Sequence, residues 1–441
     1  MRQSDTIVIG AGMAGLAAAR ELTRAGRRVL MLEARDRIGG RIDTVCREGW
    51  PIPMERGAEF VHGTPEGLWR LLDEANVVVS EVVDEHAESD ESGKLRNTGA
   101  MMQAVERTMG RLEQLPKHAP DVSWAEFLRM YASDLSHRDH VLSTAYIEGF
   151  DATDRDEISA RELQKANIAS KKVDIDTPFR PIGGYASLAA FLLHKAEQTG
   201  LLDLQLGRIV QTVRWHQGDV TVEHTGLNGT LDQSRAAHLI VTVPVGVLRA
   251  APDQPGAVRF EPELPQSHVE ALGHLRMGLA TRVMLRFDER FWECDQPELA
   301  FFHDPHQPFP TGWTQRPLKL PIITMWAGGR QAEAMRGLDE DTLVGRAIAS
   351  LSAMLQQDAG DLRRRLQDAI VGDWSGDPFA RGVYAYVTVG GSGCRETLAK
   401  PIDDTLYFAG EATDVALSGT TAGALESGAR AANLILGAAR V

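Results

Sequence analysis

Cysteine is scarce in this sequence, with three residues among 441. Cys46, Cys294 and Cys394 lie far apart, are odd in number and form no CxxC pair. This pattern excludes a zinc ribbon and a thioredoxin-like redox centre, and it gives no sign of a disulfide framework. We therefore expect no bound metal and a reduced, cytoplasmic setting.

Basic residues are also in deficit, since 47 Lys and Arg stand against 61 Asp and Glu, a formal net charge of −14. This balance disfavours nucleic-acid binding and a polybasic membrane anchor. No apolar run reaches about 18 residues, so no spanning helix is expected. Residues 1–5 lead straight into an apolar strand, so no signal peptide is expected.

Aromatic residues are few, at 6%, whereas glycine is frequent, with 42 residues. Frequent glycine indicates many backbone positions that need unusual angles or a close approach. At about 150 residues per domain, the length allows up to about three domains. A chain of this length can bury a sizeable core without disulfides or metals.

The clearest motif lies in the first 35 residues. Thr6–Ile9 predicts a buried strand, Leu16–Arg24 a helix and Val29–Leu32 a second strand that ends at Glu33. Between the first strand and the helix stands the turn GAGMAG, residues 10–15. This order is that of a βαβ unit of about 30 residues.

The three glycines of that turn have separate physical roles. Gly10 allows the tight turn, Gly12 lets the backbone approach a pyrophosphate, and Gly15 lets helix and strand pack closely. The pyrophosphate would lie at the helix N-terminus, where N–H groups and the helix dipole favour negative charge. Glu33, 18 residues after Gly15, is placed to bind ribose hydroxyls and disfavours NADP. The motif does not separate NAD from FAD.

A second glycine pair follows, in the run from Arg35 through Gly39 and Gly40 to Arg41. It indicates another close approach of backbone to ligand, with Arg41 able to reach phosphate oxygens. A solvated basic turn is the alternative.

The rest of the chain divides by pattern. Residues 65–180 are mostly helical and amphipathic, with a polar stretch at 81–97 that predicts a loop or an excursion from the helical part. Strands are expected within 204–222, 238–243, 284–287, 321–326 and 383–389, and a helix over 338–355. The last segment, 405–436, predicts a strand, a loop and a helix. Gly410-Glu411 there suits a sugar hydroxyl of a ligand, and the helix start at 420–423 offers free N–H groups to acceptor oxygens of a ligand.

Motifs at both ends of the chain carry a resemblance. They are IVIGAGMAGLAAA, LEARDRIGGR and GAEFVHG near the N-terminus, and YFAGE, SGTTAGA and SG near the C-terminus. Weaker matches lie at 181–184, 210–213, 277–292, 326–329 and 374–384. The chain resembles, over nearly its whole length, the flavin-dependent amine oxidases, the superfamily of monoamine oxidases, polyamine oxidases and lysine demethylases.

This resemblance implies an α/β fold in which a Rossmann-like FAD-binding domain is interleaved with a substrate domain of mixed sheet and helices (α+β). The FAD domain would be discontinuous, over 1–66, 181–262 and 390–441, and the substrate domain would comprise 67–180 and 263–389. In monoamine oxidases a cysteine directly before an aromatic-cage tyrosine carries the flavin covalently. Val383 stands there in this chain, so FAD is expected to be non-covalent.

The implied activity is oxidation of a primary or secondary amine, with polyamines among the candidate substrates, to an imine by hydride transfer to flavin N5. Reoxidation by O₂ would give H₂O₂, and the imine would hydrolyse to an aldehyde or ketone plus an amine or ammonia. The cofactor carries the hard step, and an apolar slot would favour the neutral amine. The expected partners are a small-molecule amine and O₂, with the protein a monomer or a dimer.

Arg282 marks a departure from the family. A lysine that holds a water at flavin N5 is expected at this position, four residues after Gly278. Arginine keeps the charge but is larger, planar and never a base. A guanidinium facing the flavin would alter oxygen reactivity, and the alternative is an Arg282 turned outward to a surface carboxylate.

The other catalytic candidate is Tyr384, which matches the first aromatic-cage residue of the family. The second cage position corresponds to Thr420, which is not aromatic. Such a one-sided cage is more similar to polyamine oxidases and lysine demethylases than to monoamine oxidases.

Substrate contacts are expected from Glu59, which could pair a second cationic group of a polyamine, and from His62, which could hydrogen-bond an amine. The alternative for both residues is a contact to the flavin alone, or a place behind the residues that touch the ligands. Glu148 and Asp151 are weaker candidates, and a solvated acidic face is the preferred interpretation for that pair. The expected cofactor contacts are Gly10, Ala11, Gly12, Gly15, Glu33, Arg35, Gly40, Arg41, Gly57, Ala58, Val210, Gly410, Glu411, Thr420 and Thr421.

Three rival functions remain open. An L-amino-acid oxidase would need an arginine to clamp the substrate carboxylate, with Arg180 or Arg381 as candidates. A flavin desaturase or dehydrogenase with poor O₂ reactivity is the second, kept open by Arg282. A flavoprotein scaffold without activity is the third.

Overall fold

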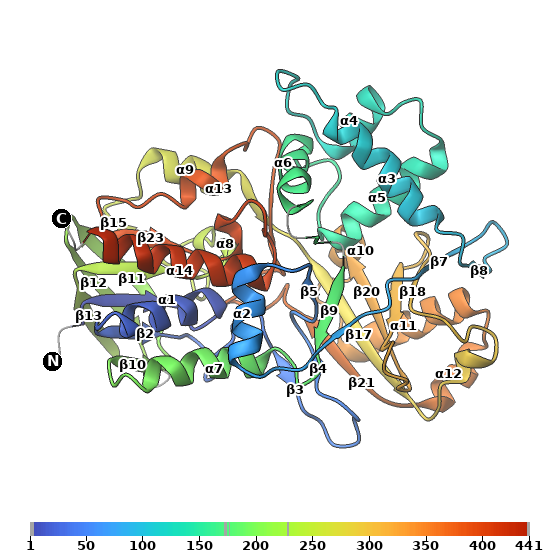
Figure 1. The fold of residues 1–441 in the computed structure, drawn as a ribbon, viewed down its shortest axis with the longest axis horizontal. Coiled ribbons are helices and arrows are strands. Elements are labelled where there is room, and N and C mark those ends of the chain that lie inside the picture. The colour runs from blue at the N-terminus through green and yellow to red at the C-terminus, as the bar shows by residue number, and fades with distance from the viewer. Residues whose placement is uncertain (1–3, 172–173, 176, 227–228, 439–441) are drawn as a thin grey trace.

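The computed structural model describes residues 4–171, 174–175, 177–226 and 229–438. Figure 1 shows an elongated molecule with two ends of different architecture. Helices α1 (Met13–Arg24) and α14 (Thr421–Ala438) lie side by side at one end, and a broad sheet lies at the other.

A five-stranded sheet in the order β10-β2-β1-β14-β23 forms the core of the first end, and every pairing in it is parallel. β1 and β2 are buried along their whole length, as expected when both faces of a parallel sheet are covered. The predicted α/β class is therefore confirmed. The strands are β1 (Thr6–Ile9), β2 (Val29–Leu32), β10 (Leu202–Gln205), β14 (His238–Val241) and β23 (Leu406–Phe408).

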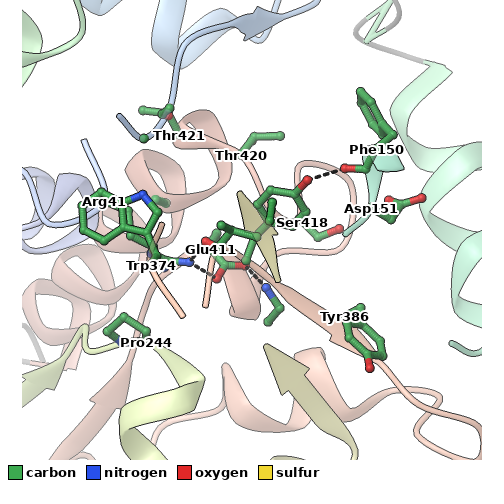
Figure 2. Close-up of a pocket in the computed structure, with 18 of the residues that line it drawn as sticks. Arg41, Phe150, Asp151, Pro244, Trp374, Tyr386, Glu411, Ser418, Thr420 and Thr421 are labelled. Atoms are coloured by element: carbon green, nitrogen blue, oxygen red, sulfur yellow. Dashed lines mark hydrogen bonds and ion pairs between the residues drawn. The ribbon is translucent and has the colours of Figure 1, made fainter. Parts of the chain in front are cut away.

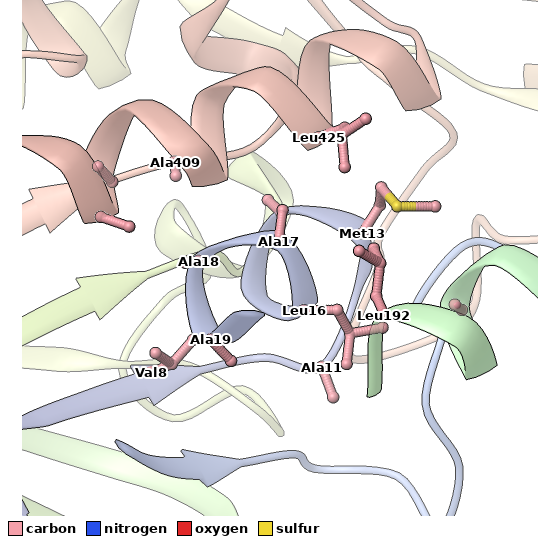
Figure 3. Close-up of a cluster of buried hydrophobic side chains, with 14 of the residues drawn as sticks. Val8, Ala11, Met13, Leu16, Ala17, Ala18, Ala19, Leu192, Ala409 and Leu425 are labelled. Carbon is pink, nitrogen blue, oxygen red and sulfur yellow. The ribbon is translucent and has the colours of Figure 1, made fainter. Parts of the chain in front are cut away.

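One face of this sheet is covered by α1, α14 and α7 (Ala186–Glu197). Val8 of β1 and Ala18 of α1 belong to the hydrophobic cluster on that face, and Figure 3 shows α1 lying between α14 and α7. The first and last helices can approach so closely because their contact is built from small residues. A Cβ added at Gly428 of α14 would come within 2.0 Å of the Ala14 carbonyl oxygen.

The opposite face packs against a four-stranded sheet in the order β13-β12-β11-β15. Its strands are β11 (Ile209–His216), β12 (Asp219–Thr225), β13 (Leu231–Ala236) and β15 (Arg259–Glu261). Val213 and Val222 of this sheet are fully buried against Ile7 and Leu239 of the parallel sheet.

A seven-stranded sheet in the order β21-β17-β20-β19-β18-β7-β8 forms the other end. Side chains alternate between its faces. Val283 and Leu285 of β17 pack beneath α11 (Glu340–Leu355), whereas Arg282 of the same strand lies on the opposite face. The strands are β7 (His86–Ser89), β8 (Leu95–Arg96), β17 (Ala280–Phe287), β18 (Phe301–His303), β19 (Thr311–Thr314), β20 (Ile322–Gly328) and β21 (Leu366–Asp373).

Helices α3 (Ala100–Glu113), α4 (Trp124–Tyr131), α5 (His137–Phe150) and α6 (Ala160–Ser170) form a separate group that adjoins this sheet (Figure 1). A three-stranded sheet, β5 (Val61–His62), β9 (Pro178–Pro181) and β6 (Val79–Glu81), lies between the two ends. The remaining elements are β3 (Thr44–Val45), β4 (Met54–Glu55), α2 (Glu66–Glu74), α8 (Val245–Leu248), α9 (Gln266–Gly273), β16 (Leu275–Met277), η2 (Phe291–Cys294), α10 (Gly329–Glu333), α12 (Ala359–Arg365), β22 (Ala385–Val387), α13 (Cys394–Leu398) and η3 (Glu411–Thr413).

For the polar stretch 81–97, predicted as a loop or an excursion, the loop is wrong, because β7 and β8 lie in this stretch and add two strands to the seven-stranded sheet. The strands of the five-stranded sheet all come from the segments expected to form the FAD domain, 1–66, 181–262 and 390–441. We retain the two-domain division as a proposal. Across the described ranges, no helix combines the length and the apolar character needed to cross a membrane.

Candidate active site

A cavity of about 540 Å³ lies between the parallel sheet and the seven-stranded sheet. Figure 2 shows part of its wall, where Arg41 from the N-terminal region lies beside Glu411 and near Thr421 from the C-terminal region. Every predicted site residue except Ala11 and Gly15 lines the cavity. The lining set is Gly10, Gly12, Glu33, Arg35, Gly40, Arg41, Gly57, Ala58, Glu59, His62, Val210, Arg282, Tyr384, Gly410, Glu411, Thr420 and Thr421.

In the glycine turn, packing of the fold requires a glycine at position 15 but not at position 12. A Cβ at Gly15 would lie 2.0 Å from the Gly10 carbonyl oxygen, so helix and strand could not pack. A Cβ at Gly12 would meet nothing nearer than 3.9 Å. Gly12 is also the N-cap of α1, which has no side-chain cap and no acid in its first turn. The free N–H groups and the open space at Gly12 fit a pyrophosphate.

Glu33 is buried at the end of β2. One carboxylate oxygen accepts the Ala11 N–H at 2.7 Å and the other accepts the Arg35 N–H at 2.9 Å. Ala11 therefore serves by fixing this carboxylate rather than by lining the cavity. Each oxygen retains lone-pair capacity for a ribose hydroxyl.

An ion pair joins the two ends of the chain across the cavity. Arg41 Nη1 lies 2.9 Å from Glu411 Oε1 and also donates to the Val383 carbonyl. Glu411 follows Gly410, which has a φ of +134° and, among the described residues, no atom within 4 Å of an added Cβ. The backbone there turns toward open space, as it would beside a bound cofactor. Together these groups fit a flavin dinucleotide.

Thr420 lines the cavity and is also the N-cap of α14. Its hydroxyl accepts the Gly423 N–H at 3.0 Å and donates to the Leu417 carbonyl at 2.7 Å. The expected set of free N–H groups at 420–423 is therefore smaller, because Gly423 is already paired. The N–H groups of Thr421 and Ala422 have no partner within the helix and suit a flavin ring.

Tyr384 lies in the cavity wall, and its hydroxyl donates to the carbonyl of Phe150, the last residue of α5. Burial raises the pKa of Tyr384 well above its usual range. Gly419 lies beside the ring, and a Cβ there would come within 3.5 Å of it. Tyr384 is thus a neutral, fixed wall.

Arg282 is buried, so the alternative of a surface-facing guanidinium is wrong. Its Nη1 lies 3.0 Å from Glu59 Oε2 and donates to the Glu55 carbonyl at 2.7 Å. The guanidinium also lies 5.6 and 5.3 Å from the ring centroids of Trp313 and Trp326.

Glu59 is shared between two arginines. Arg180 Nη2 approaches its Oε1 at 2.7 Å, and Arg282 approaches its Oε2. The neighbouring Glu55 is buried, which raises its pKa to about 7. Because Glu59 already balances two guanidinium groups, its expected role as the partner of a substrate cation is disfavoured. Its observed contacts are those of a residue that positions Arg282.

His62 faces the cavity between the rings of Phe60 and Phe150, with centroid distances of 6.2 and 5.5 Å. Burial lowers its pKa to about 4. The imidazole is therefore neutral near pH 7 and can hydrogen-bond an amine without adding positive charge.

An aromatic row across the seven-stranded sheet was missed from the sequence. Trp326 pairs with Arg282 across β20 and β17, and the centroid distances along the row are 6.2 Å from Trp326 to Trp313, 6.0 Å to Phe301 and 5.0 Å to His86. All four rings line the cavity. The strands that hold them were only partly predicted, so their common face was not visible.

At the His86 end of the aromatic row lies a chain of hydrogen-bonded side chains. Asp84 bonds His86 at 2.9 Å, His86 bonds His303 at 2.8 Å, and His303 bonds Thr311 at 3.1 Å. Burial lowers the pKa of His303 well below its usual range. The cavity therefore has a polar end with a half-exposed carboxylate at Asp84.

The interpretation of Glu148 and Asp151 as a solvated acidic face is wrong. Glu148 is buried and lies 3.8 and 3.6 Å from Arg155 and Arg330, outside the cavity wall. Asp151 lines the cavity. The arginine candidates for a carboxylate clamp, Arg180 and Arg381, do not line it.

Comparison with known proteins shows which family this chain resembles in sequence and in fold. The family model described as "Flavin containing amine oxidoreductase" matches residues 13–174 and 173–436. Lysine-specific histone demethylase 2 of Homo sapiens is 28% identical over 98% of this chain, which spans 53% of that protein. Polyamine oxidase 3 of Oryza sativa subsp. japonica is 29% identical over 98% of this chain and 89% of its own length. The structure of wild-type putrescine oxidase bound to putrescine matches with a TM-score of 0.83 at 22% identity, over 99% of each chain, a likeness of fold.

Proposed function

The chain belongs to the family of flavin-containing amine oxidoreductases, with FAD as cofactor, and from this premise we propose that it oxidises a primary or secondary amine, with a polyamine as the favoured substrate. The observation that carries this proposal is one continuous cavity. It runs from the dinucleotide cradle at Gly12 and Glu33 to a neutral pocket at His62 and Tyr384, and on along the aromatic row.

When bound, the flavin would supply two-electron oxidation of the amine to an imine by accepting a hydride at N5, and O₂ would take the electrons and give H₂O₂. We propose that the flavin is held by Gly12, Glu33, Arg41, Glu411 and the start of α14, all of which line the cavity. We propose that the attachment is non-covalent, because none of the three cysteines lines the cavity.

The protein's own task is to present a neutral amine. His62 and Tyr384 are both uncharged near pH 7, because burial lowers the pKa of the first and raises that of the second. The apolar wall lowers the pKa of an amine that enters it. Tyr384 is fixed by the Phe150 carbonyl, so the substrate path beside it is preformed.

An elongated substrate is favoured by the aromatic row. A methylene chain can lie along Trp326, Trp313 and Phe301, and a second ammonium group would gain cation–π contacts and the Asp84 carboxylate at the far end. Glu59 is not needed for this role.

An L-amino-acid oxidase is less favoured. Its carboxylate would need a free guanidinium, but Arg282 is engaged by Glu59 and by the Glu55 carbonyl. Arg395 lines the cavity, but it is engaged as well, because it donates to the carbonyls of Ala412 and Ala385 at 3.1 and 2.7 Å.

We also propose a cytoplasmic setting and a monomeric or dimeric state. Both proposals rest on the sequence alone.

The test is aerobic turnover of purified, FAD-loaded protein with a series of monoamines, diamines and polyamines, plus L-amino acids, followed by peroxide release. We expect peroxide with the amines and the highest kcat/KM for a substrate with a second cation. Turnover of L-amino acids but not of amines would favour an L-amino-acid oxidase. Flavin reduction without release of peroxide would favour a flavin desaturase or dehydrogenase.

A further inference from the structure

Asp151 is distinguished from the other carboxylates that line the cavity. Within the described part of the chain, each of the others has a partner, and no hydrogen bond or ion pair engages the Asp151 side chain. The paired carboxylates are Glu33 with the Ala11 N–H, Glu59 with Arg180 and Arg282, Asp84 with His86, Glu162 with Lys165, and Glu411 with Arg41.

The backbone around Asp151 is fixed on both sides. The preceding carbonyl, at Phe150, accepts the Tyr384 hydroxyl, and the following carbonyl, at Ala152, accepts the Leu279 N–H at 3.2 Å. Ala152 is 1% exposed and has a φ of +52°, a left-handed conformation that is costly for alanine. Figure 2 shows Asp151 beside Phe150 and across from Ser418. The two bonded carbonyls therefore hold the backbone on both sides of Asp151.

The surroundings favour a carboxylate that changes its protonation state. Burial raises the pKa of Asp151 to about 7, opposed by the positive charge of Arg395. Arg395 donates to the carbonyls of Ala385 and Ala412 and forms no ion pair with Asp151. Tyr384 faces it with a neutral hydroxyl, and Glu148 is paired outside the cavity. Among the described residues, no charged side chain thus occupies the place of a counter-ion.

We propose that Asp151 forms the ion pair with the substrate ammonium group as it enters the cavity and then takes its proton. The step is a proton transfer, in which one N–H bond breaks and one O–H bond forms: R–NH₃⁺ and the carboxylate become R–NH₂ and the carboxylic acid. No electrons are exchanged, and the proton later returns to water. This inference rests on the proposed amine oxidation and adds the group that prepares its substrate.

A binding experiment tests the ion pair without turnover. The probe is tert-butylammonium, which has no hydrogen on the carbon next to nitrogen and cannot be oxidised to an imine. Titration calorimetry of FAD-loaded protein should show binding that Asp151→Asn weakens by about 30-fold or more, the effect of removing one partner of a buried charge pair. The control is Asp154→Asn, because Asp154 pairs with Arg330 outside the cavity. Equal affinities for the wild type and Asp151→Asn would overturn the ion pair.

The pH profile tests the proton transfer. Anaerobic flavin reduction by the wild type should rise as Asp151 ionises, with an apparent pKa near 7. In Asp151→Asn that limb should vanish. The rate should then follow the concentration of the neutral amine in solution, which rises about tenfold per pH unit below the amine pKa. Asp151→Glu should keep a limb at a shifted pH. An unchanged profile in Asp151→Asn would refute the proton transfer, whereas a wild type that no amine reduces would refute the proposed function itself.

Discussion

Glu59→Gln is expected to destabilise the protein strongly while leaving side-chain volume almost unchanged. The Glu59 side chain is 5% exposed, and its carboxylate lies 2.7 Å from Arg180 and 3.0 Å from Arg282. A glutamine amide carries no charge, so it cannot balance the positive charge of Arg180 or Arg282, and both guanidinium groups stay buried. Removing one partner of a buried ion pair costs about 3–5 kcal/mol, because an uncompensated charge remains. The free energy of unfolding should fall by this amount.

Equilibrium urea unfolding, followed by tryptophan fluorescence, measures the change. Glu126→Gln is the matched control, since its i,i+3 ion pair with Arg129 is at the surface and should be lost without measurable effect. Adding Arg180→Gln to Glu59→Gln removes one of the two uncompensated cations and should restore on the order of 1 kcal/mol. If Glu59→Gln behaves like the surface control, the arginine cluster does not depend on this carboxylate and the reasoning fails.

Three further outcomes are expected. Gly12→Ala should fold but lose FAD, because its Cβ meets no protein atom within 3.9 Å, whereas Gly15→Ala should fail to fold normally, as circular dichroism and flavin absorbance would reveal. Arg282→Lys should change flavin reoxidation by O₂ by about tenfold or more and flavin reduction by less, since lysine loses the planar contacts; equal changes in stopped-flow traces would argue against a flavin-facing group. Glu55 has a pKa raised to about 7, so its folded form holds a proton that the unfolded chain releases, and its contribution to stability is present below about pH 4.5 and lost as the pH rises to about 7. Glu55→Gln should therefore remove that loss, and urea midpoints of the variant and wild type that fall equally between pH 5 and 8 would contradict this.

The nucleotide end of the site could be predicted from the sequence because its function depends on backbone geometry. The spacing of Gly10, Gly12 and Gly15 and the position of Glu33 follow from one βαβ unit, and local signals suffice to place them. The α/β fold class, the family, FAD and the amine oxidase class were likewise predicted, and each is confirmed.

The substrate end could not be predicted in the same way. Its side chains meet through strand register over long sequence separations, as Trp326 with Arg282 and Phe301 with His86. The polar sequence around His86 gave no strand signal, because β-propensity depends on neighbours that the sequence does not reveal. Asp151 was misjudged for a related reason, since helical periodicity cannot show that a helix ends at a cavity.

One measurement tests the central claim most directly: anaerobic mixing of the FAD-loaded protein with one equivalent of a polyamine, followed by the flavin absorbance. Oxidation of an amine at this cavity predicts stoichiometric bleaching of the flavin and, when air is admitted, recovery of the oxidised spectrum with one equivalent of H₂O₂. A flavin that stays oxidised with every monoamine, diamine and polyamine tried would contradict the account.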